Sequence, residues 1–185
     1  SWAKVKQLPI TLLGGGSNVV LAGNLAGLVI HIAILGVELV AEQNTSSESD
    51  QCIVRVGAGE NWHQLVLYTI EQGWYGLENL SLIPGLAGAA PIQNIGAYGV
   101  ELSDRFHSLE AIDLSSGEAI TMTPSDCQFG YRDSFFKGTG RDQYAITAIN
   151  LRLSTKADLC LEYPALNKFF EKNEPAIAIT PKQVS

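Results

Sequence analysis

The chain has 185 residues, of which 46% are hydrophobic and 17% are charged, and its formal net charge is -7. This composition is typical of a globular protein with one medium domain and excludes an intrinsically disordered chain. The acidic sequence contains no cluster of Lys and Arg, which argues against a nucleic-acid partner. No signal peptide or membrane-length apolar run is visible, and three widely spaced cysteines indicate a reducing compartment, so we expect a cytoplasmic protein without membrane association.

The two ends of the chain have the patterns of incomplete helices. Residues 1–7 (SWAKVKQ) are typical of the last turns of an amphipathic helix. Residues 179–185 (ITPKQVS) are typical of a helix start, with Thr180 as the N-cap and Pro181 at the first helical position. Because the sequence stops before this second helix could form, we expect the chain to be a piece of a longer protein.

The first third of the sequence predicts short strands joined by tight loops. Apolar, β-branched runs occupy residues 9–13 (PITLL), 19–21 (VVL) and 27–35 (GLVIHIAIL), and residues 52–59 (CIVRVGAG) alternate as a strand does. The polar residues 42–50 between them predict a hairpin loop or a boundary between two lobes.

The rest of the chain mixes helices and strands. Asn61 is expected to cap a helix whose apolar residues share one face. Residues 109–123 predict a hairpin, residues 144–154 a strand and residues 164–173 a short helix. Residues 74–103 show no regular pattern, and so long an irregular segment in a compact domain is usually functional.

Residues 14–18 (GGGSN) follow a predicted strand and combine three glycines with two side-chain donors. Glycine reaches positive φ and lets a ligand approach the backbone, so successive N–H groups can form a concave nest for phosphate oxygens. A plain turn between two strands explains a lone GGG equally well. The segment lacks the Lys-Ser/Thr pair of a Walker A loop and the GxGxxG spacing of a Rossmann turn, so both are disfavoured.

Residues 83–99 (IPGLAGAAPIQNIGAYG) contain four glycines and no charged side chain. A loop packed only for structural reasons would have to satisfy all of this backbone internally, which is difficult for an irregular segment. The freed backbone and the uncharged polar groups of Gln93, Asn94 and Tyr98 suit an extended apolar ligand with polar edges. An isoalloxazine ring is one such ligand.

Five ordered motifs resemble the UDP-N-acetylenolpyruvoylglucosamine reductase family: GGGSN, VGAGENWHQL, GLENLSLIPG, PIQNIGAYGVEL and FGYRDSFFK. The similarity runs from about residue 8 to the end of the chain. It implies an α+β fold, the two-lobed FAD-binding domain of the vanillyl-alcohol-oxidase / p-cresol methylhydroxylase type. The implied lobes are residues 1–53 and 54–154, and residues 155–185 would lead toward a missing C-terminal substrate-binding domain.

The resemblance implies a flavin-dependent oxidoreductase that holds FAD noncovalently, takes hydride from NADPH and reduces UDP-N-acetylglucosamine enolpyruvate to UDP-N-acetylmuramate in peptidoglycan synthesis. The family's general-acid serine and C-terminal glutamate belong to motifs that this chain lacks, so we expect FAD binding without the complete reaction. We expect the parent enzyme to be a monomer and this chain to self-associate through exposed apolar surface.

The cofactor-binding residues implied by the resemblance lie in the two glycine-rich segments and on one later strand. Relatives often carry Gly or Ser where this chain has Ala89 and Ala90, so a hydroxyl contact is lost there and backbone N–H groups must serve. The implied residues are Gly14, Gly15, Gly16, Ser17, Asn18, Ile83, Pro84, Gly85, Ala89, Ile92, Gln93, Asn94, Gly96, Ala97, Tyr98, Gly99 and Ile146.

Arg132 lies among aromatic residues in FGYRDSFFK. From the residues alone, a snorkelling surface arginine or a buried partner of Asp133 is a better interpretation than a catalytic group. The resemblance instead implies that Arg132 is catalytic, because its relatives use this arginine to bind the substrate carboxylate and stabilise the enolate. It also implies that Tyr131, Arg132 and Tyr163 bind substrate, although Tyr163 fits a core position nearly as well.

The histidines and cysteines show no ligand spacing, so we expect no metal site and assign these residues to packing or to the surface. Two alternatives to the reductase stay open. One is an oxidase or dehydrogenase of the same FAD superfamily that acts on an alcohol or a hydroxy acid. The other is a fragment without cofactor that serves as a structural or interaction domain. The histidines are His31, His63 and His107, and the cysteines are Cys52, Cys127 and Cys160.

Overall fold

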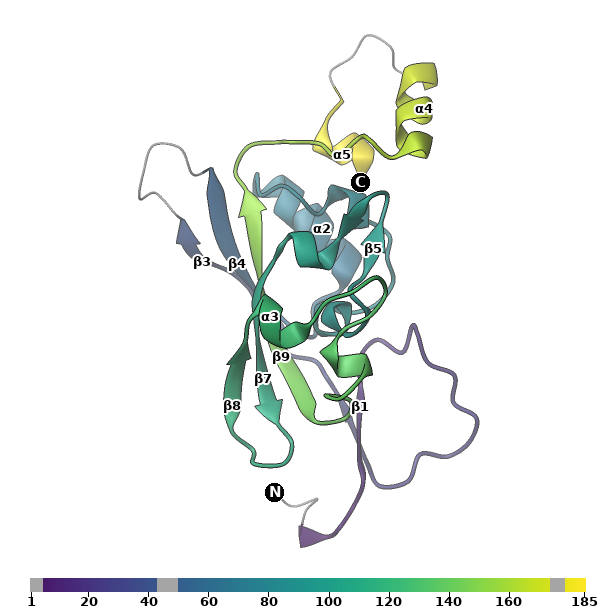
Figure 1. Cartoon of the computed structure of the whole chain (residues 1–185), viewed down its shortest axis with the longest axis vertical. Helices are drawn as coiled ribbons and strands as arrows, with labels where there is room; N and C mark the ends of the chain where they lie inside the picture. Colours follow the sequence, from purple (N-terminus) through teal and green to yellow (C-terminus); the bar gives the residue numbers. More distant parts are fainter. Residues whose placement is uncertain (1–4, 43–49, 174–178) are drawn as a thin grey trace.

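The computed structural model describes residues 5–42, 50–173 and 179–185. Its largest element is a five-stranded sheet with the strand order β3-β4-β9-β7-β8, in which neighbouring strands are antiparallel. Figure 1 shows this sheet running along the left of the molecule. Its strands are β3 (Val37–Glu42), β4 (Gln51–Gly57), β7 (Phe106–Asp113), β8 (Ala119–Met122) and β9 (Tyr144–Ser154).

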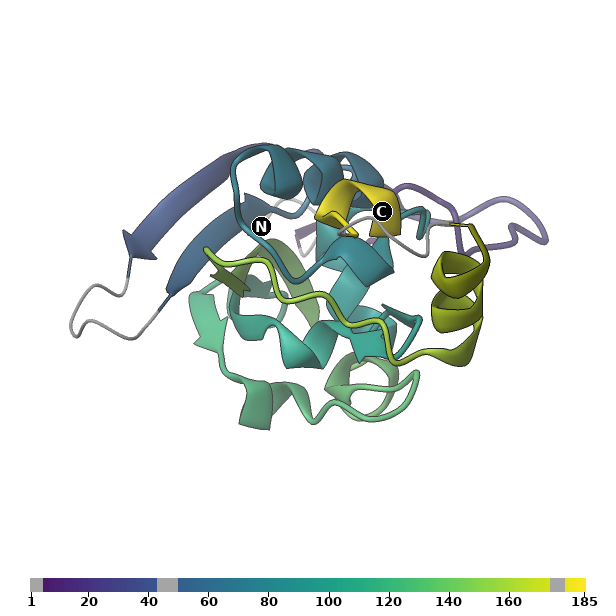
Figure 2. The same cartoon turned by 90° about the horizontal axis from the view of Figure 1, so that it is seen from above.

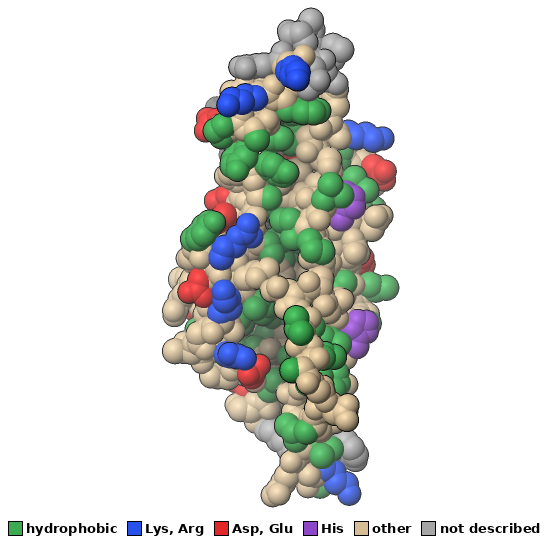
Figure 3. Space-filling view, turned by 90° about the vertical axis from the view of Figure 1, so that its right-hand side faces the viewer, with side chains coloured by type: hydrophobic (Ala, Val, Ile, Leu, Met, Phe, Trp, Pro, Cys, Tyr) green, Lys and Arg blue, Asp and Glu red, His purple; other side chains and the backbone are tan. Residues whose placement is uncertain are grey.

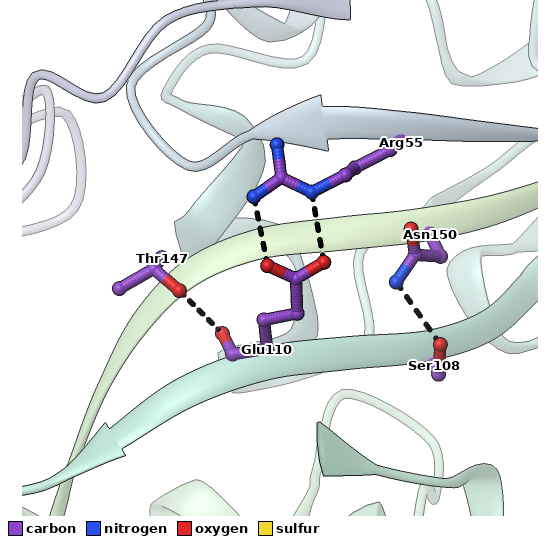
Figure 4. Close-up of polar contacts among 5 residues, drawn as sticks. All are labelled: Arg55, Ser108, Glu110, Thr147 and Asn150. Atoms are coloured by element: carbon purple, nitrogen blue, oxygen red, sulfur yellow. Dashed lines mark hydrogen bonds and ion pairs between the residues drawn. The ribbon is translucent and has the colours of Figure 1, made fainter. Parts of the chain in front are cut away.

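The two faces of the sheet differ in chemistry because strand side chains alternate. In β4, Val54 and Val56 are fully buried in the core, whereas Arg55 points to the opposite face. There Arg55 donates two hydrogen bonds, of 2.8 and 2.7 Å, to the carboxylate of Glu110 across β9 (Figure 4). Ser108 and Asn150 continue this polar face, joined by a 3.1 Å hydrogen bond.

Helix α2 (Trp62–Glu71) lies on the core side of the sheet and confirms the predicted helix. Asn61 is its N-cap, since its side chain accepts a hydrogen bond from Gln64 N at 3.0 Å. The apolar face packs inward, with Trp62 and Leu65 buried. Figure 2 shows α2 beside the curved sheet, and α2 contacts η1 and η2 of the following segment.

Residues 74–103 pack between α2 and the sheet. They fold into three short 3-10 helices and one two-stranded hairpin, none of which the sequence predicted. One of the helices, η2, packs directly on β9 and β4. The elements are η1 (Glu78–Leu80), η2 (Ala87–Gln93), β5 (Gly96–Ala97), β6 (Val100–Glu101) and η3 (Leu102–Asp104).

The N-terminal part forms a separate, parallel pair of strands, β1 (Ile10–Leu13) and β2 (Leu28–His31). The predicted strand at residues 9–13 is thus confirmed, and the one at 27–35 is shorter than expected. The strand predicted at residues 19–21 is wrong. Those residues belong to an extended loop without a partner strand among the described residues, and Val20 is 95% exposed.

Much of the loop between β1 and β2 is apolar and exposed, including Val19, Val20 and Leu21. Figure 1 shows this loop extending to the lower right, and Figure 3 shows hydrophobic side chains in a band along the face that carries it. The expected apolar surface is therefore present here. Self-association through it stays a prediction.

The remaining predicted elements are confirmed. The hairpin is β7 and β8, residues 144–154 form β9, and the short helix is α4 (Pro164–Asn173). Beyond residue 179 a single turn, α5 (Pro181–Val184), forms with Thr180 as its N-cap. The chain also contains α3 (Pro124–Cys127) and η4 (Phe135–Lys137).

Two predictions concern regions that the structure describes only in part. Residues 1–4 of the predicted helix tail and residues 43–49 of the predicted polar loop lie outside the described residues. The lobe boundary expected after residue 53 falls within β4, and β3, which precedes it, belongs to the same sheet as β9. The division into lobes of residues 1–53 and 54–154 stays a prediction.

Candidate functional site

The two glycine-rich segments lie against each other. A Cβ atom added to Gly14 would lie 3.8 Å from the Cβ of Ala89, and one added to Gly15 would lie 3.5 Å from Leu86. Asn18 Nδ2 also donates a 3.1 Å hydrogen bond to Gln93 Oε1. Residues that are about 75 positions apart in sequence thus share one surface, as expected from the sequence.

Glycine at two of these positions leaves open space beside the backbone. Gly16 and Gly99 have φ values of +70° and +83°, which disfavour other residues. A Cβ atom at either position would meet no atom within 4 Å. Glycine is therefore not needed there to relieve a contact with the protein, and the backbone at both positions stays accessible to a ligand.

A cavity of about 710 Å³ opens beside the second glycine-rich segment, and its volume is within the range of small-molecule sites. It is lined by residues 81–84 and 96–101, together with Tyr131, Arg132 and Tyr163. The structure thus brings together nine residues that the sequence analysis assigned to cofactor or substrate. These are Ile83, Pro84, Gly96, Ala97, Tyr98, Gly99, Tyr131, Arg132 and Tyr163.

The other expected cofactor residues lie outside this lining. Those of the segment 14–18 border residues 85–93 on an adjoining surface, where Ser17 Oγ lies within 3.2 Å of the position of a Cβ on Gly85. Ala89 and Ile92 are exposed there. Ile146 is different, because it lies on β9 with a side chain that is buried in the hydrophobic core.

Arg132 stands at the cavity wall in a left-handed backbone conformation, with φ of 53°. Its guanidinium donates a 2.6 Å hydrogen bond to Gly96 O, and Lys137 Nζ donates to the Arg132 carbonyl at 2.8 Å. Among the described residues Arg132 forms no ion pair with Asp133, whose carboxylate accepts from Ser134 N. Of the five guanidinium N–H donors one is therefore used by the cavity wall, and the group carries a permanent positive charge.

Asn94 organises the cavity loop from inside the protein. Its side chain is 1% exposed, and its φ is 44°. The amide donates to Glu101 Oε2 at 2.8 Å and to Gly130 O at 3.1 Å, and its oxygen accepts from Ser103 N at 3.0 Å. These bonds connect the cavity loop to the turn that carries Arg132. Asn94 was expected at the cofactor. Its buried amide has a structural role that could not be seen in the sequence.

Glu78 is a second buried polar group that the sequence analysis missed. Only 3% of it is exposed, and its carboxylate accepts two hydrogen bonds from Gly76 N at 2.8 and 3.1 Å. Burial raises the pKa of Glu78, against the opposing effects of these bonds and of the positive charge of Arg105. The sequence around Glu78, GLENLSLIPG, carries no local signal for a buried acid.

The cysteines and histidines lie where packing was expected. Cys127 is fully buried, and burial with the nearby Asp126 raises the pKa of its thiol to about 12, so it is not a reactive thiolate. His63 Nδ1 lies 2.9 Å from Ser81 Oγ, and His107 accepts a hydrogen bond from Arg152. In the described part of the chain, no group of three His, Cys, Asp or Glu side chains could hold a metal ion.

The helices give no sign of a membrane span. In residues 5–42, 50–173 and 179–185, no helix is both long enough and apolar enough to cross a bilayer.

Comparison with known proteins identifies relatives over most of the sequence. Residues 1–123 match a family model described as an FAD binding domain. The chain is 47% identical over 170 residues to the UDP-N-acetylenolpyruvoylglucosamine reductase of Bdellovibrio bacteriovorus and 52% identical over 146 residues to that of Paraburkholderia xenovorans. These matches cover 92% and 79% of this chain but 49% and 41% of the relatives, so the chain spans about half of their length or less.

A solved structure has the same fold. The reductase of the same name from Thermus caldophilus superposes with a TM-score of 0.61 at 23% sequence identity, over 97% of this chain and 61% of that one. This similarity confirms the expected α+β, FAD-binding fold.

Proposed function

The chain belongs to the FAD-binding domain family, whose cofactor is FAD, and we propose that it is the flavin-holding part of an NADPH-dependent UDP-N-acetylenolpyruvoylglucosamine reductase. In this proposal the whole enzyme reduces UDP-N-acetylglucosamine enolpyruvate to UDP-N-acetylmuramate for peptidoglycan synthesis. The one observation that carries the proposal is the meeting of the two glycine-rich segments beside a cavity that holds Arg132.

The residues present fit FAD. Exposed backbone at residues 14–18, together with the hydroxyl of Ser17 and the amide of Asn18, suits a pyrophosphate. The cavity beside Ile83, Pro84 and residues 96–99 is apolar and rich in backbone N–H and C=O groups, which suits a flavin ring. FAD, when bound, supplies the capacity to accept and donate hydride. The protein supplies orientation and a surface that shields the ring from water.

Arg132 gives the cavity its positive charge. Because its guanidinium is fixed to Gly96 O, we propose that its remaining N–H donors bind the carboxylate of the enolpyruvyl group and stabilise negative charge that develops there. Tyr131 and Tyr163, which line the same cavity, would contact the sugar nucleotide. A small UDP-sugar substrate, a cytoplasmic location and a monomeric parent enzyme belong to the same proposal.

A pair of matched glycine variants tests FAD binding. Gly16 and Gly117 both have positive φ, and a Cβ at either position would meet no atom within 4 Å, but Gly117 lies in the β7–β8 turn. Gly16→Val and Gly117→Val therefore introduce comparable strain. We expect the unsubstituted chain to take up FAD, which should quench the fluorescence of the flavin. FAD should also raise the melting temperature of the chain, because the ligand binds the folded state.

Gly16→Val is expected to weaken FAD binding by roughly tenfold or more, since about 1.4 kcal/mol of lost binding energy has that effect. Gly117→Val should bind FAD as the parent does. The proposed site would be contradicted if the unsubstituted chain took up no FAD, or if the two variants lost the same amount of FAD affinity.

A further inference from the structure

Asn79 is buried in η1, with 4% of its surface exposed, and its side-chain nitrogen joins two distant segments. Nδ2 donates to Tyr98 O at 3.0 Å and to Cys160 O at 2.8 Å. An amide nitrogen carries two N–H groups, so both are used. The acceptors lie 19 and 81 residues away in sequence, which makes Asn79 a bridge between parts of the chain that share no strand.

Both bridged segments carry a tyrosine of the cavity. Tyr98 lies in the turn between β5 and β6 with φ of 47°, and Tyr163 directly precedes α4. Their rings contact each other edge to face, with centroids 5.5 Å apart and planes at 84°. Both line the cavity beside Arg132. The relative position of the two tyrosines therefore affects the shape of the cavity on this side.

The segment that carries Tyr163 has few other attachments. It leaves the sheet where β9 ends at Ser154 and reaches α4 at Pro164 without regular structure. Among the described residues, no hydrogen bond other than that from Asn79 joins residues 157–162 to the body of the protein. Cys160 adds a partly buried side chain against the core. The amide of Asn79 is thus the main directional contact that holds this segment beside Tyr98.

We propose that Asn79 is a positioning residue for the pair Tyr98 and Tyr163, and that through this pair it sets the affinity of the cavity for the sugar nucleotide. The choice of residue follows from the chemistry. Two carbonyl oxygens converge on one point, and only a group with two N–H donors and no charge satisfies both there. Aspartate would place a third acceptor against them, and leucine would leave both without a donor. The ligand part of this proposal rests on the proposed function.

The variants are Asn79→Leu, which has a similar volume, and Asn79→Ser, which keeps one donor and disturbs folding less. The control is Asn150→Leu. This variant also removes a partly buried hydrogen bond, the one from Asn150 to Ser108 Oγ, but Asn150 lies on the polar face of the sheet, away from the cavity loop (Figure 4). Two readouts are needed. One is amide hydrogen exchange of residues 155–163, and the other is the change in flavin absorbance as UDP-N-acetylglucosamine enolpyruvate is added to the FAD-loaded protein.

Asn79→Leu is expected to speed exchange at residues 155–163, because both hydrogen bonds of the Asn79 amide are lost. It is also expected to weaken sugar-nucleotide binding roughly tenfold, which corresponds to about 1.4 kcal/mol. Asn79→Ser should have a smaller effect of the same kind, and Asn150→Leu should change neither readout. The proposal is overturned if Asn79→Leu leaves either hydrogen exchange or sugar-nucleotide affinity unchanged. It is also overturned if Asn150→Leu changes both of these as much as Asn79→Leu does.

The two proposals can fail separately. If the parent protein binds neither FAD nor the sugar nucleotide, the proposed function is wrong. Hydrogen exchange, which needs no ligand, then decides alone whether Asn79 positions the Tyr163 segment: faster exchange supports that role, and unchanged exchange removes it.

Discussion

The five-stranded sheet and the irregular segment of residues 74–103 both contribute side chains to the hydrophobic core, yet they satisfy their backbone groups in different ways. In the sheet, strand ladders pair the N–H and C=O groups, and side chains are free to alternate between core and surface. In the irregular segment, backbone pairs are short, such as β5 with β6 and Tyr75 with Ser154, and buried side chains add to them. Asn79, Asn94 and Glu78 each bond to backbone groups. The cavity forms beside this segment, where the two-residue strands β5 and β6 pair only with each other and the turn between them carries Tyr98 and Gly99.

The charged groups of the two regions show the same contrast. In the sheet, Glu110 and Arg55 form an ion pair on a face that is open to solvent, with 35% and 29% of their side chains exposed. In the irregular segment, Glu78 is buried and bonds to Gly76 N instead of a cation. Water screens the first carboxylate, whereas the second is stabilised only by fixed groups of the protein.

The largest effect is expected in the sheet. Leu151 lies in the central strand β9 and is fully buried. Leu151→Ala should lower the free energy of unfolding by about 3 kcal/mol, through lost burial and the cavity left behind. Urea unfolding measures the change. Leu82→Ala is the control, since this side chain is 73% exposed and should lose less than about 0.5 kcal/mol. Equal losses would show that packing does not distinguish the two regions.

The second effect tests whether side-chain amides take the place of a ladder. Asn94→Ala removes three hydrogen bonds and leaves Gly130 O and Ser103 N without their partner. Alanine also tolerates the left-handed conformation less well, so we expect a loss of about 2 kcal/mol in the same unfolding experiment. Gln93→Ala, next to it but more exposed, should cost far less. If Asn94→Ala unfolds at the urea concentration of the parent, the amide is not structural.

The smallest effect is a difference in pH dependence between the two carboxylates. The Arg55 hydrogen bonds lower the pKa of Glu110, so its stabilisation is present above the pKa of an unfolded glutamate, about 4.3, and is lost as pH falls through the folded value. Burial raises the pKa of Glu78, so its contribution is complete below about 4.3 and is lost as pH rises through the folded value.

Unfolding free energies between about pH 3 and about pH 7 reveal these opposite slopes. Glu110→Gln should destabilise by about 0.5 kcal/mol near neutral pH, a small value because the pair is solvent-screened, and by less in acid. Glu78→Gln should be most destabilising in acid and least so near neutral pH. Slopes of the same sign for both variants would mean that the environments of the two carboxylates do not differ as described.

The sequence allowed good predictions wherever a regular element has its own period. The helix after Asn61, the hairpin of β7 and β8, and the strand β9 follow from apolar spacing and turn residues alone. The strand expected at residues 19–21 failed for the converse reason. Three apolar residues satisfy the local pattern, but a strand also needs a partner, and nothing pairs with this loop among the described residues.

For the candidate site, motifs predicted which residues would matter but not how they contribute. The two glycine-rich segments, residues 14–18 and 83–99, were expected to meet, and they do so through residues 85–93. Nine of the expected residues line one cavity, which residues 14–18 adjoin but do not line. Asn79 and the structural role of Asn94 could not be predicted. Their partners, at Cys160 and Gly130, are distant in sequence, and a buried amide has the same local pattern as an exposed one.

The sequence by itself thus determined the family, the helix after Asn61, the longer strands and the two glycine-rich segments, because each of these depends on local spacing and composition. The tertiary structure alone decided that buried amides hold the irregular segment, that Arg132 is fixed to Gly96 O, and that Tyr98 and Tyr163 contact each other at the cavity wall. These features depend on which distant backbone groups are left without a strand partner, and a chain shows that only after it has folded.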